Sequence, residues 1–321
     1  MSRVVLRYRP DVLLMTVPLS QPESVDWRLD EIVATLRESR EVTHHIRHRG
    51  RVRELPSRPA IKQILEGLMA ALFPTHHGRE DLNASDIDYY VGNILSRTLG
   101  ALHEQVRRSL LCTLDHDDPE DPGWREHARQ IVASFAAQLG EIRGLLVSDL
   151  RAAYQGDPAA TSISEVLLCY PGVTAVSYFR IGHALHRLGA TLAARFISEI
   201  AHAETGIEIH PAAQVGESFF IDHGTGVVIG ETAIIGNRVR LYQAVTLGAK
   251  RFPVDDSGVL VKGHARHPVV EDDVVIYAGA TILGRITLGH HSTIGGNVWL
   301  THSVPPHSNI TQAQMRSGAS E

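Results

Sequence analysis

An aliphatic residue recurs every six positions between Ile209 and Leu300. The repeat begins as Ile209, Val215, Ile221, Val227 and, after an interruption, resumes as Val270, Ile276, Ile282, Leu288, Ile294, Leu300. Between these runs two columns are apolar, either Ala233, Val239, Val245 or Ile229, Ile235, Leu241, Leu247. No helix repeats at six residues and an isolated strand repeats at two. The pattern therefore predicts a parallel β-helix, in which three hexapeptides form one triangular coil of about eighteen residues.

Helical periodicity dominates the chain before this repeat. Ile61, Ile64, Leu65, Leu68 and Leu72 follow three- and four-residue spacing, and similar stripes continue until Thr205-Gly206 closes the last helix. The predicted fold class is α+β, with an all-α N-terminal domain followed by a left-handed parallel β-helix of hexapeptide repeats. We expect an extension at 1–59, a helical domain at 60–204, the β-helix at 205–306 and a tail at 307–321.

Composition narrows the classes of protein that remain. The chain has 321 residues and a net charge of −5, which argues against nucleic acid as the main partner. No apolar run reaches the roughly 18 residues of a membrane span, so no membrane association is expected. The two cysteines, Cys112 and Cys169, make a disulfide framework improbable, and we expect a reducing cytoplasm.

The interruption of the repeat, residues 249–265, is rich in turn-forming and basic residues. Insertions into repeat proteins project as loops from one face, which is often the binding face. Arg266-His267 follows this insertion directly, so we expect the loop to lie beside a functional site.

Polar residues beside the aliphatic columns are the candidates for chemistry. Glu208 and His223 are fifteen residues apart, close to one coil, and we expect them within hydrogen-bond reach. A carboxylate that orients an imidazole makes the histidine a better general base. Asp222 and Arg266 have the charges to orient a zwitterion, because arginine matches a carboxylate through two parallel hydrogen bonds.

Other interpretations of the histidines remain open. His210, His223 and His267 are candidates for a zinc site between subunits, as in γ-class carbonic anhydrases, which share this repeat. A non-catalytic scaffold is a further alternative, supported only by the unusual N-terminal residues. We interpret His290, His291, His302 and His307 as structural or solvated.

Several segments together resemble serine O-acetyltransferase. They are Asp157-Pro158, 178–183 (YFRIGH), 206–213 (GIEIHPAA), 221–232 (IDHGTGVVIGET), 245–248 (VTLG) and 266–268 (RHP). The resemblance spans roughly Asp149 to Pro306. It implies transfer of an acetyl group from acetyl-CoA to L-serine, which gives O-acetyl-L-serine for cysteine synthesis, with no metal.

The resemblance also implies roles for individual residues. His223 would be the general base and Glu208 its partner, whereas much of the family has Asp in place of this Glu. The substrate ammonium would be held by Asp157 and Asp222, and its carboxylate by Arg266 and His267. The pantetheine arm would lie near Ala249, Ala278 and Gly296, with Lys250, Arg251 or Lys262 as phosphate contacts.

Assembly and regulation are implied in the same way. The family forms its site between neighbouring β-helices of a homotrimer, which helical domains can pair into hexamers, and L-cysteine commonly inhibits it. Residues 312–321 lack the terminal Ile that the family inserts into O-acetylserine sulfhydrylase, so we do not expect a stable complex with that enzyme. Acceptors other than serine, such as homoserine or a sugar amine, remain an alternative.

Overall fold

The computed structural model describes residues 26–40, 55–113, 122–252, 254, 255 and 257–313. Two compact units are present, residues 1–51 and 52–321. The first unit contains the described helix α1 (Leu29–Glu38), whose Ile32, Val33 and Leu36 side chains are exposed. Most of the expected extension 1–59 and the end of the tail 307–321 lie outside the described residues.

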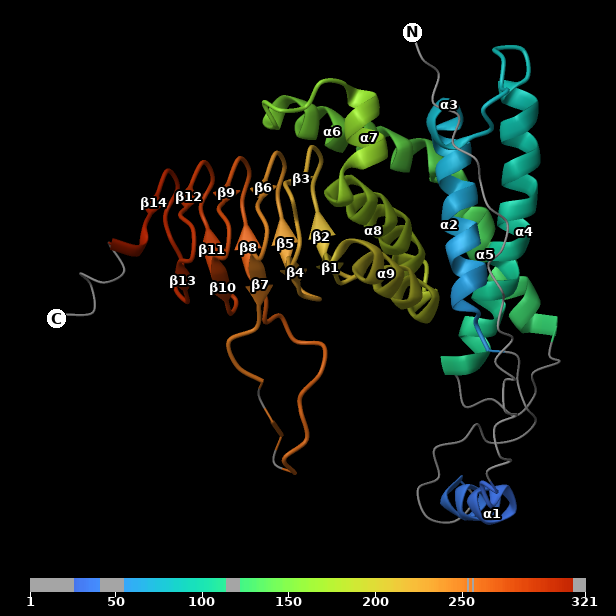
Figure 1. The fold of residues 1–321 in the computed structure, drawn as a ribbon. Coiled ribbons are helices and arrows are strands. Elements are labelled where there is room, and N and C mark those ends of the chain that lie inside the picture. The colour runs from blue at the N-terminus through green and yellow to red at the C-terminus, as the bar shows by residue number, and fades with distance from the viewer. Residues whose placement is uncertain (1–25, 41–54, 114–121, 253, 256, 314–321) are drawn as a thin grey trace, which may run out of the picture. The chain divides into compact units, whose positions relative to one another are not determined.

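The second unit begins with helices, as the periodicity predicted (Figure 1). They are α2 (Arg58–Leu72), α3 (Pro74–His77), α4 (Ile87–Thr113), α5 (Pro122–Ala137), α6 (Leu139–Gly156), α7 (Ile163–Cys169), α8 (Pro171–Arg187) and α9 (Thr191–Thr205). Within the described part of the chain no single helix is long and apolar enough to cross a membrane. The pair α5 and α6 passes that test only when joined across a 47° bend.

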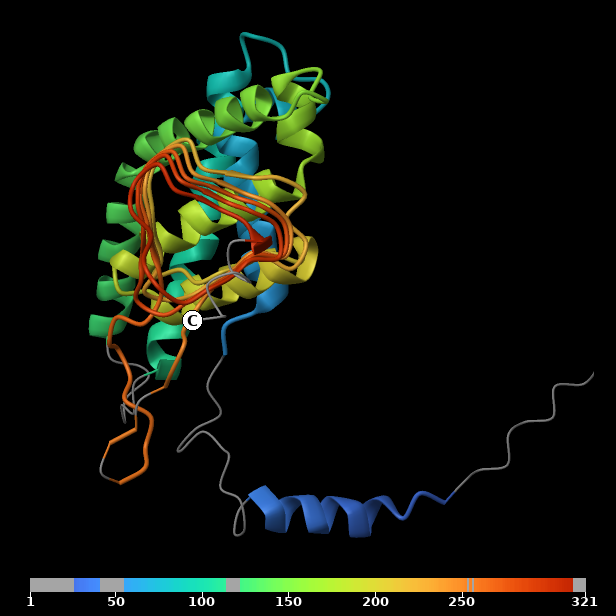
Figure 2. The ribbon, with the colours of Figure 1, turned by 90° about the vertical axis from the view of Figure 1, so that its left-hand side faces the viewer.

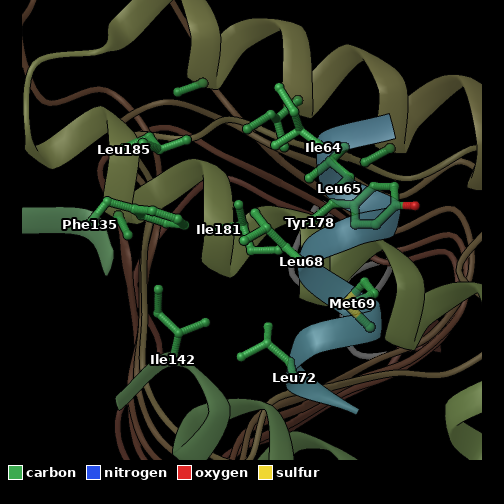
Figure 3. Close-up of a cluster of buried hydrophobic side chains, with 14 of the residues drawn as sticks. Ile64, Leu65, Leu68, Met69, Leu72, Phe135, Ile142, Tyr178, Ile181 and Leu185 are labelled. Carbon is green, nitrogen blue, oxygen red and sulfur yellow. The ribbon is translucent and has the colours of Figure 1, made fainter. Parts of the chain in front are cut away.

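The helices share one apolar core. Figure 3 shows Leu65 and Leu68 of α2 near Ile181 and Leu185 of α8, with Phe135 of α5 beside them. All five side chains are almost completely buried. Burial of side chains of this size stabilises the folded chain by roughly 1.5–3 kcal/mol each.

Helix α8 joins this core to the β-helix, because it is buried on both sides. Ile181 and Leu185 belong to the helical core, whereas Val176 and Phe179 pack in the core of the β-helix. At the N-terminus of α8, a Cβ on Gly172 would lie 2.1 Å from the carbonyl oxygen of Ile221. Glycine is therefore needed for the close approach of helix and coil.

The predicted left-handed β-helix of hexapeptide repeats is confirmed. Its strands are β1 (Glu208–Ile209), β2 (Gln214–Val215), β3 (Phe220–Ile221), β4 (Val228–Ile229), β5 (Ile234–Ile235), β6 (Arg240–Leu241), β7 (Thr246–Gly248), β8 (Val269–Val270), β9 (Val275–Ile276), β10 (Thr281–Leu283), β11 (Thr287–Leu288), β12 (Thr293–Ile294), β13 (Trp299–Leu300) and β14 (Asn309–Ile310). They form three parallel sheets: the first β1-β4-β7-β10-β13, the second β2-β5-β8-β11 and the third β3-β6-β9-β12-β14. Viewed along their stack, the coils superimpose as one triangular outline (Figure 2).

The register explains why two apolar columns were visible in the sequence. Glu208 pairs with Val228, twenty residues on, whereas Val228 pairs with Thr246, eighteen residues on. The first coil therefore has two extra residues, and they lie between Ile221 and Val228. The strand column moves from Ile221 to Ile229 at this point, and the residues of both columns are buried.

Two of the three corners of the triangle matter below. The His223 corner leads from the third sheet to the first and comprises 222–227, 242–245, 277–280 and 295–298. The Arg266 corner leads from the first sheet to the second and comprises 210–213, 230–233, 249–268, 284–286 and 301–303. The insertion 249–265 leaves the Arg266 corner after β7 and projects from the coils (Figure 1).

A buried ion pair fastens the helices to the first coil. Arg180 of α8 donates to both carboxylate oxygens of Asp149 in α6, at 3.0 and 3.1 Å. Arg180 also donates to the carbonyl oxygens of Val215 and Gly216, and Asp149 accepts from the backbone N–H of Phe219. The backbone groups that this pair binds therefore run from the end of β2 to the residue before β3.

We expect Asp149→Ala to destabilise the protein by about 3–5 kcal/mol, because the charge of Arg180 would remain buried without its partner. Urea unfolding at fixed protein concentration would measure the loss. Glu126→Gln is the matched control: it breaks the exposed Glu126–Arg129 pair and should cost less than about 1 kcal/mol. A similar cost for both variants would contradict the role of the buried pair.

Candidate functional site

The His223 corner presents an imidazole to solvent. His223 has a left-handed backbone, with φ of 58°, on the longest segment of this corner. Its side chain is 72% exposed, and its Nε2 lies 3.9 Å from Oδ1 of Asp222, which is only 13% exposed. A largely buried carboxylate thus lies beside an accessible imidazole.

Asp157 approaches the same corner from the end of α6. Its Oδ2 accepts a hydrogen bond of 2.5 Å from the Tyr170 hydroxyl, and its Oδ1 accepts one of 2.8 Å from the Ala159 N–H. The bond from Tyr170 is the main cause that lowers the pKa of Asp157, with smaller contributions from Ala159 and from the charge of His223. The same bond raises the pKa of Tyr170 to about 12. Asp157 is therefore an ionised carboxylate close to His223.

The Arg266 corner holds a second charged group. Arg266 donates a hydrogen bond of 2.5 Å to Oε2 of Glu231, and this bond lowers the pKa of the glutamate. The two residues are neighbours because Ile234 pairs with Val269, which places Glu231 and Arg266 one coil apart. Glu231 holds the guanidinium against the coil.

Thr232 fixes the position of His267, the residue that follows Arg266 at this corner. The Thr232 N–H donates to Nδ1 of His267 at 3.0 Å, and Oγ1 of Thr232 accepts from the backbone N–H groups of Arg266 and His267. A neutral His267 with Nδ1 as acceptor carries its proton on Nε2. Burial, and then the charge of Arg266, lower the pKa of His267 to about 4, so the ring is neutral near pH 7.

Within one chain, the predicted site residues fall into two groups. Asp157, Asp222 and His223 gather at one corner, and Arg266 and His267 at the other, with the first sheet between them. This separation was not predicted, because the spacing of residues along the chain does not show which corner each occupies.

Glu208 lies in β1, on the first sheet, opposite Val228. Among the hydrogen bonds of the described residues, none joins its carboxylate to His223. Its assignment as the partner of His223 remains a prediction.

The predicted acetyl-CoA contacts divide in the same way. Ala278 and Gly296 lie on consecutive coils of the His223 corner, where Asn297 donates to the Ala278 carbonyl. Ala249 and Lys250 lie at the Arg266 corner, with Lys250 against Gly284 of the next coil. Lys262 is exposed in the projecting loop.

Comparison with known proteins identifies the family of this chain. A family model described as bacterial transferase hexapeptide (six repeats) matches residues 267–302. A protein of Synechococcus elongatus named "Serine acetyltransferase, plasmid" is 56% identical over 296 residues, which cover 91% of this chain and 92% of that protein. The chain belongs to the serine acetyltransferase family.

Solved structures of the family share the fold. Serine acetyltransferase 1 of Entamoeba histolytica, in complex with L-cysteine, has a TM-score of 0.68 and 35% identity, covering 83% of this chain and 90% of that one. The serine acetyltransferase of Neisseria gonorrhoeae, in complex with serine, has a TM-score of 0.50 and 28% identity, covering 78% and 94%. Membership makes this chain an acyltransferase, as its motifs predicted.

Some residues of this family member's site were missed by sequence reasoning. Glu231 and Thr232 resemble ordinary turn residues, yet they hold Arg266 and His267. Removing the insertion from the sequence and counting whole coils would have aligned Glu231 with Arg266 and Thr232 with His267. No comparable signal marks Tyr170, because its contact with Asp157 joins a turn between helices to the end of α6.

The three histidines that were candidates for a zinc site do not meet within one chain. His210 and His267 lie at the Arg266 corner, whereas His223 lies at the other. Across the residues that the structure describes, no three potential ligands are placed to hold a metal ion. Those three histidines would need a second chain to meet.

Imidazoles that are wholly or partly buried make the stability of this protein depend on pH, and His210 and His267 have the pKa values that are lowered most. Burial, and then the charge of Arg195, lower the pKa of His210 to about 4, as burial does for His267. Each takes up a proton more readily when unfolded, so stability falls as pH drops from about 6.5 towards 4. We expect a loss of about 1 kcal/mol or more per imidazole between pH 7.5 and 5, measured by urea unfolding.

The variant His210→Gln should reduce this pH dependence, because it removes one of the imidazoles whose pKa is lowered in the folded chain. His302→Gln, at an exposed histidine, is the matched control and should retain the full dependence. An unchanged slope in His210→Gln would contradict the assignment.

Proposed function

We propose that this chain transfers the acetyl group of acetyl-CoA to the hydroxyl of L-serine in cysteine biosynthesis, with His223 as general base. The observation that carries the proposal is the exposed His223 imidazole beside Asp222 and Asp157, on a corner fixed by stacked coils. His223 takes the proton of the serine hydroxyl as its oxygen attacks the thioester carbon. The C–O bond forms, the C–S bond breaks, and the proton passes from His223 to the leaving thiolate.

Recognition of serine follows from the charges of the two groups. Asp157 and Asp222 offer carboxylates to the ammonium group, and Asp157 is held ionised by Tyr170. Arg266 and the Nε2–H of neutral His267 offer donors to the carboxylate. A small amino acid matches this set better than a sugar amine, which lacks a carboxylate.

The separation of the two groups supports a homotrimer, in which the His223 corner of one chain faces the Arg266 corner of the next. The first sheet lies between the two corners of a single chain, so one serine molecule cannot reach both groups there. A closed ring of three chains would complete each site in the same way. Pairing of two such trimers through the helices is the alternative assembly.

Glu208 is proposed to orient and stabilise the protonated His223, and Ala278 and Gly296 to hold the pantetheine arm. The same acetyl-CoA molecule would also be contacted from the Arg266 corner of the neighbouring chain, by Ala249, Lys250 and Lys262. L-cysteine, bound in the Entamoeba relative, resembles serine in its ammonium and carboxylate groups. We propose that it inhibits this enzyme at the serine site.

The acceptor is tested with acetyl-CoA and a panel of L-serine, L-homoserine and a sugar amine, by measuring thiol release. Release that depends on serine supports the proposal. Release only with another acceptor would replace serine by that compound, and stoichiometric zinc required for activity would favour the carbonic anhydrase alternative.

We expect His223→Asn to lower kcat by about 10²–10⁴-fold, because the hydroxyl would lose its proton acceptor. Thiol release at saturating serine and acetyl-CoA would measure this, and sedimentation would show whether assembly is retained. His302→Asn is the control and should leave kcat unchanged. Near-normal turnover by His223→Asn would refute its role as base.

Co-expression of His223→Asn and Arg266→Met chains should restore activity that neither variant has alone. Differently tagged chains allow mixed trimers to be purified, and about a third of their sites would combine an intact His223 corner with an intact Arg266 corner. Thiol release by the mixture, compared with the two parents, is the measurement. Activity no higher than that of the parents would mean that each site lies within one chain.

A further inference from the structure

Gln243 occupies the His223 corner on the coil after His223. Counting forward from the Ile221–Leu241 pair places Gln243 opposite His223, and counting back from the Val228–Thr246 pair places it opposite Thr225. The Ala244 N–H donates to the Thr225 carbonyl at 2.9 Å, which confirms that these segments are adjacent. Consecutive coils are about 4.8 Å apart. The side chain of Gln243 therefore starts within reach of the proposed base.

The same register continues from Gln243 to the proposed pantetheine contacts. Leu241 pairs with Ile276, and Ile276 pairs with Ile294, so Gln243, Ala278 and Gly296 lie on three successive coils. The Gly279 N–H donates to the Gln243 carbonyl, and the Asn297 N–H donates to the Ala278 carbonyl. Gln243 thus stands between the base and the pantetheine arm, where the acetyl thioester has to lie.

The carboxamide of Gln243 is not satisfied by the protein. Its Oε1 is buried and has no hydrogen-bond partner among the described residues, although the residue as a whole is partly exposed. With Oε1 turned inward, the polar atom left for a ligand is the Nε2 donor.

The corner offers further donors in line with this amide. Among the hydrogen bonds of the described residues, none has the N–H of Ala278 or of Gly296 as its donor. The Gln243 carboxamide and the backbone N–H groups of Ala278 and Gly296 are therefore three donors, one on each of three successive coils. Acetylated pantetheine carries three carbonyl acceptors in a row, one in the thioester and two in amides.

We propose that the Gln243 carboxamide binds the thioester carbonyl of acetyl-CoA and donates to its oxygen as negative charge develops there during acyl transfer. Gln243 is then a catalytic residue of the reaction proposed above, on which this inference rests. Donors aimed at such an oxyanion typically contribute about 10²–10³-fold to kcat.

Two variants of equal length remove the donor. Gln243→Met is uncharged and Gln243→Glu presents a carboxylate, and we expect both to lower kcat by about 10²-fold or more, measured with the best acceptor of the panel. Gln214→Glu, at an exposed position of β2, is the matched control and should leave kcat unchanged. A loss of less than tenfold in Gln243→Met, or a change confined to KM for acetyl-CoA, overturns the inference.

A second measurement does not depend on which acceptor is used. Acetyl-CoA labelled with ¹³C at the acetyl carbonyl reports its hydrogen bonding through the infrared stretching frequency of the bound thioester. We expect the frequency to be lower in the wild-type protein than in Gln243→Met. Equal frequencies would overturn the role of Gln243, whereas failure of serine alone as acceptor would overturn only the proposed substrate.

Discussion

The stacking of one coil on the next through backbone hydrogen bonds is the constraint on which the structure depends. Each strand donates to and accepts from its counterpart on neighbouring coils, and the inward aliphatic residues form one buried column. A slip of one residue would turn that column towards solvent, so the register is strongly specified. Corner residues then align in columns as a consequence. Glu231 meets Arg266 across thirty-five residues of sequence because their coils are adjacent.

Coil stacking places His223 and Arg266, but it cannot place Asp157, which belongs to the helices. That placement depends on how the helices are attached to the first coil. Arg180 and Asp149 are buried together, and their remaining hydrogen bonds go to backbone groups at the end of β2 and in the connection to β3. Asp149 lies two turns before the end of α6, the helix that ends beside Asp157. The ion pair therefore supports the proposed substrate site through the position of one helix.

The repeating part of the fold could be predicted from the sequence because its cause is repetitive: a buried aliphatic residue at each hexapeptide gives the period directly. The choice between two columns could not be made, because both prove to be buried. The candidate site was predictable as a set of residues and not as an arrangement. The polar residues beside the repeat already indicated His223 and Arg266, and resemblance added Asp157, whereas their division between two corners depends on the register. Tyr170 and Gln243 carry no sequence signal, since a contact between elements and an unpaired atom define them.

Departures from the eighteen-residue coil occur at the two corners that carry the candidate chemistry. The first coil has its two extra residues in the segment that contains His223, which turns that residue outward with a left-handed backbone. The insertion of 249–265 falls at the other corner, directly before Arg266. Along the third corner, by contrast, successive segments keep the regular length: 216–219, 236–239, 271–274, 289–292 and 305–308. Regular hexapeptides build a uniform surface, and a binding site requires side chains and loops that leave it. The breaks in the repeat are therefore the positions at which the proposed substrate-binding residues leave the regular scaffold.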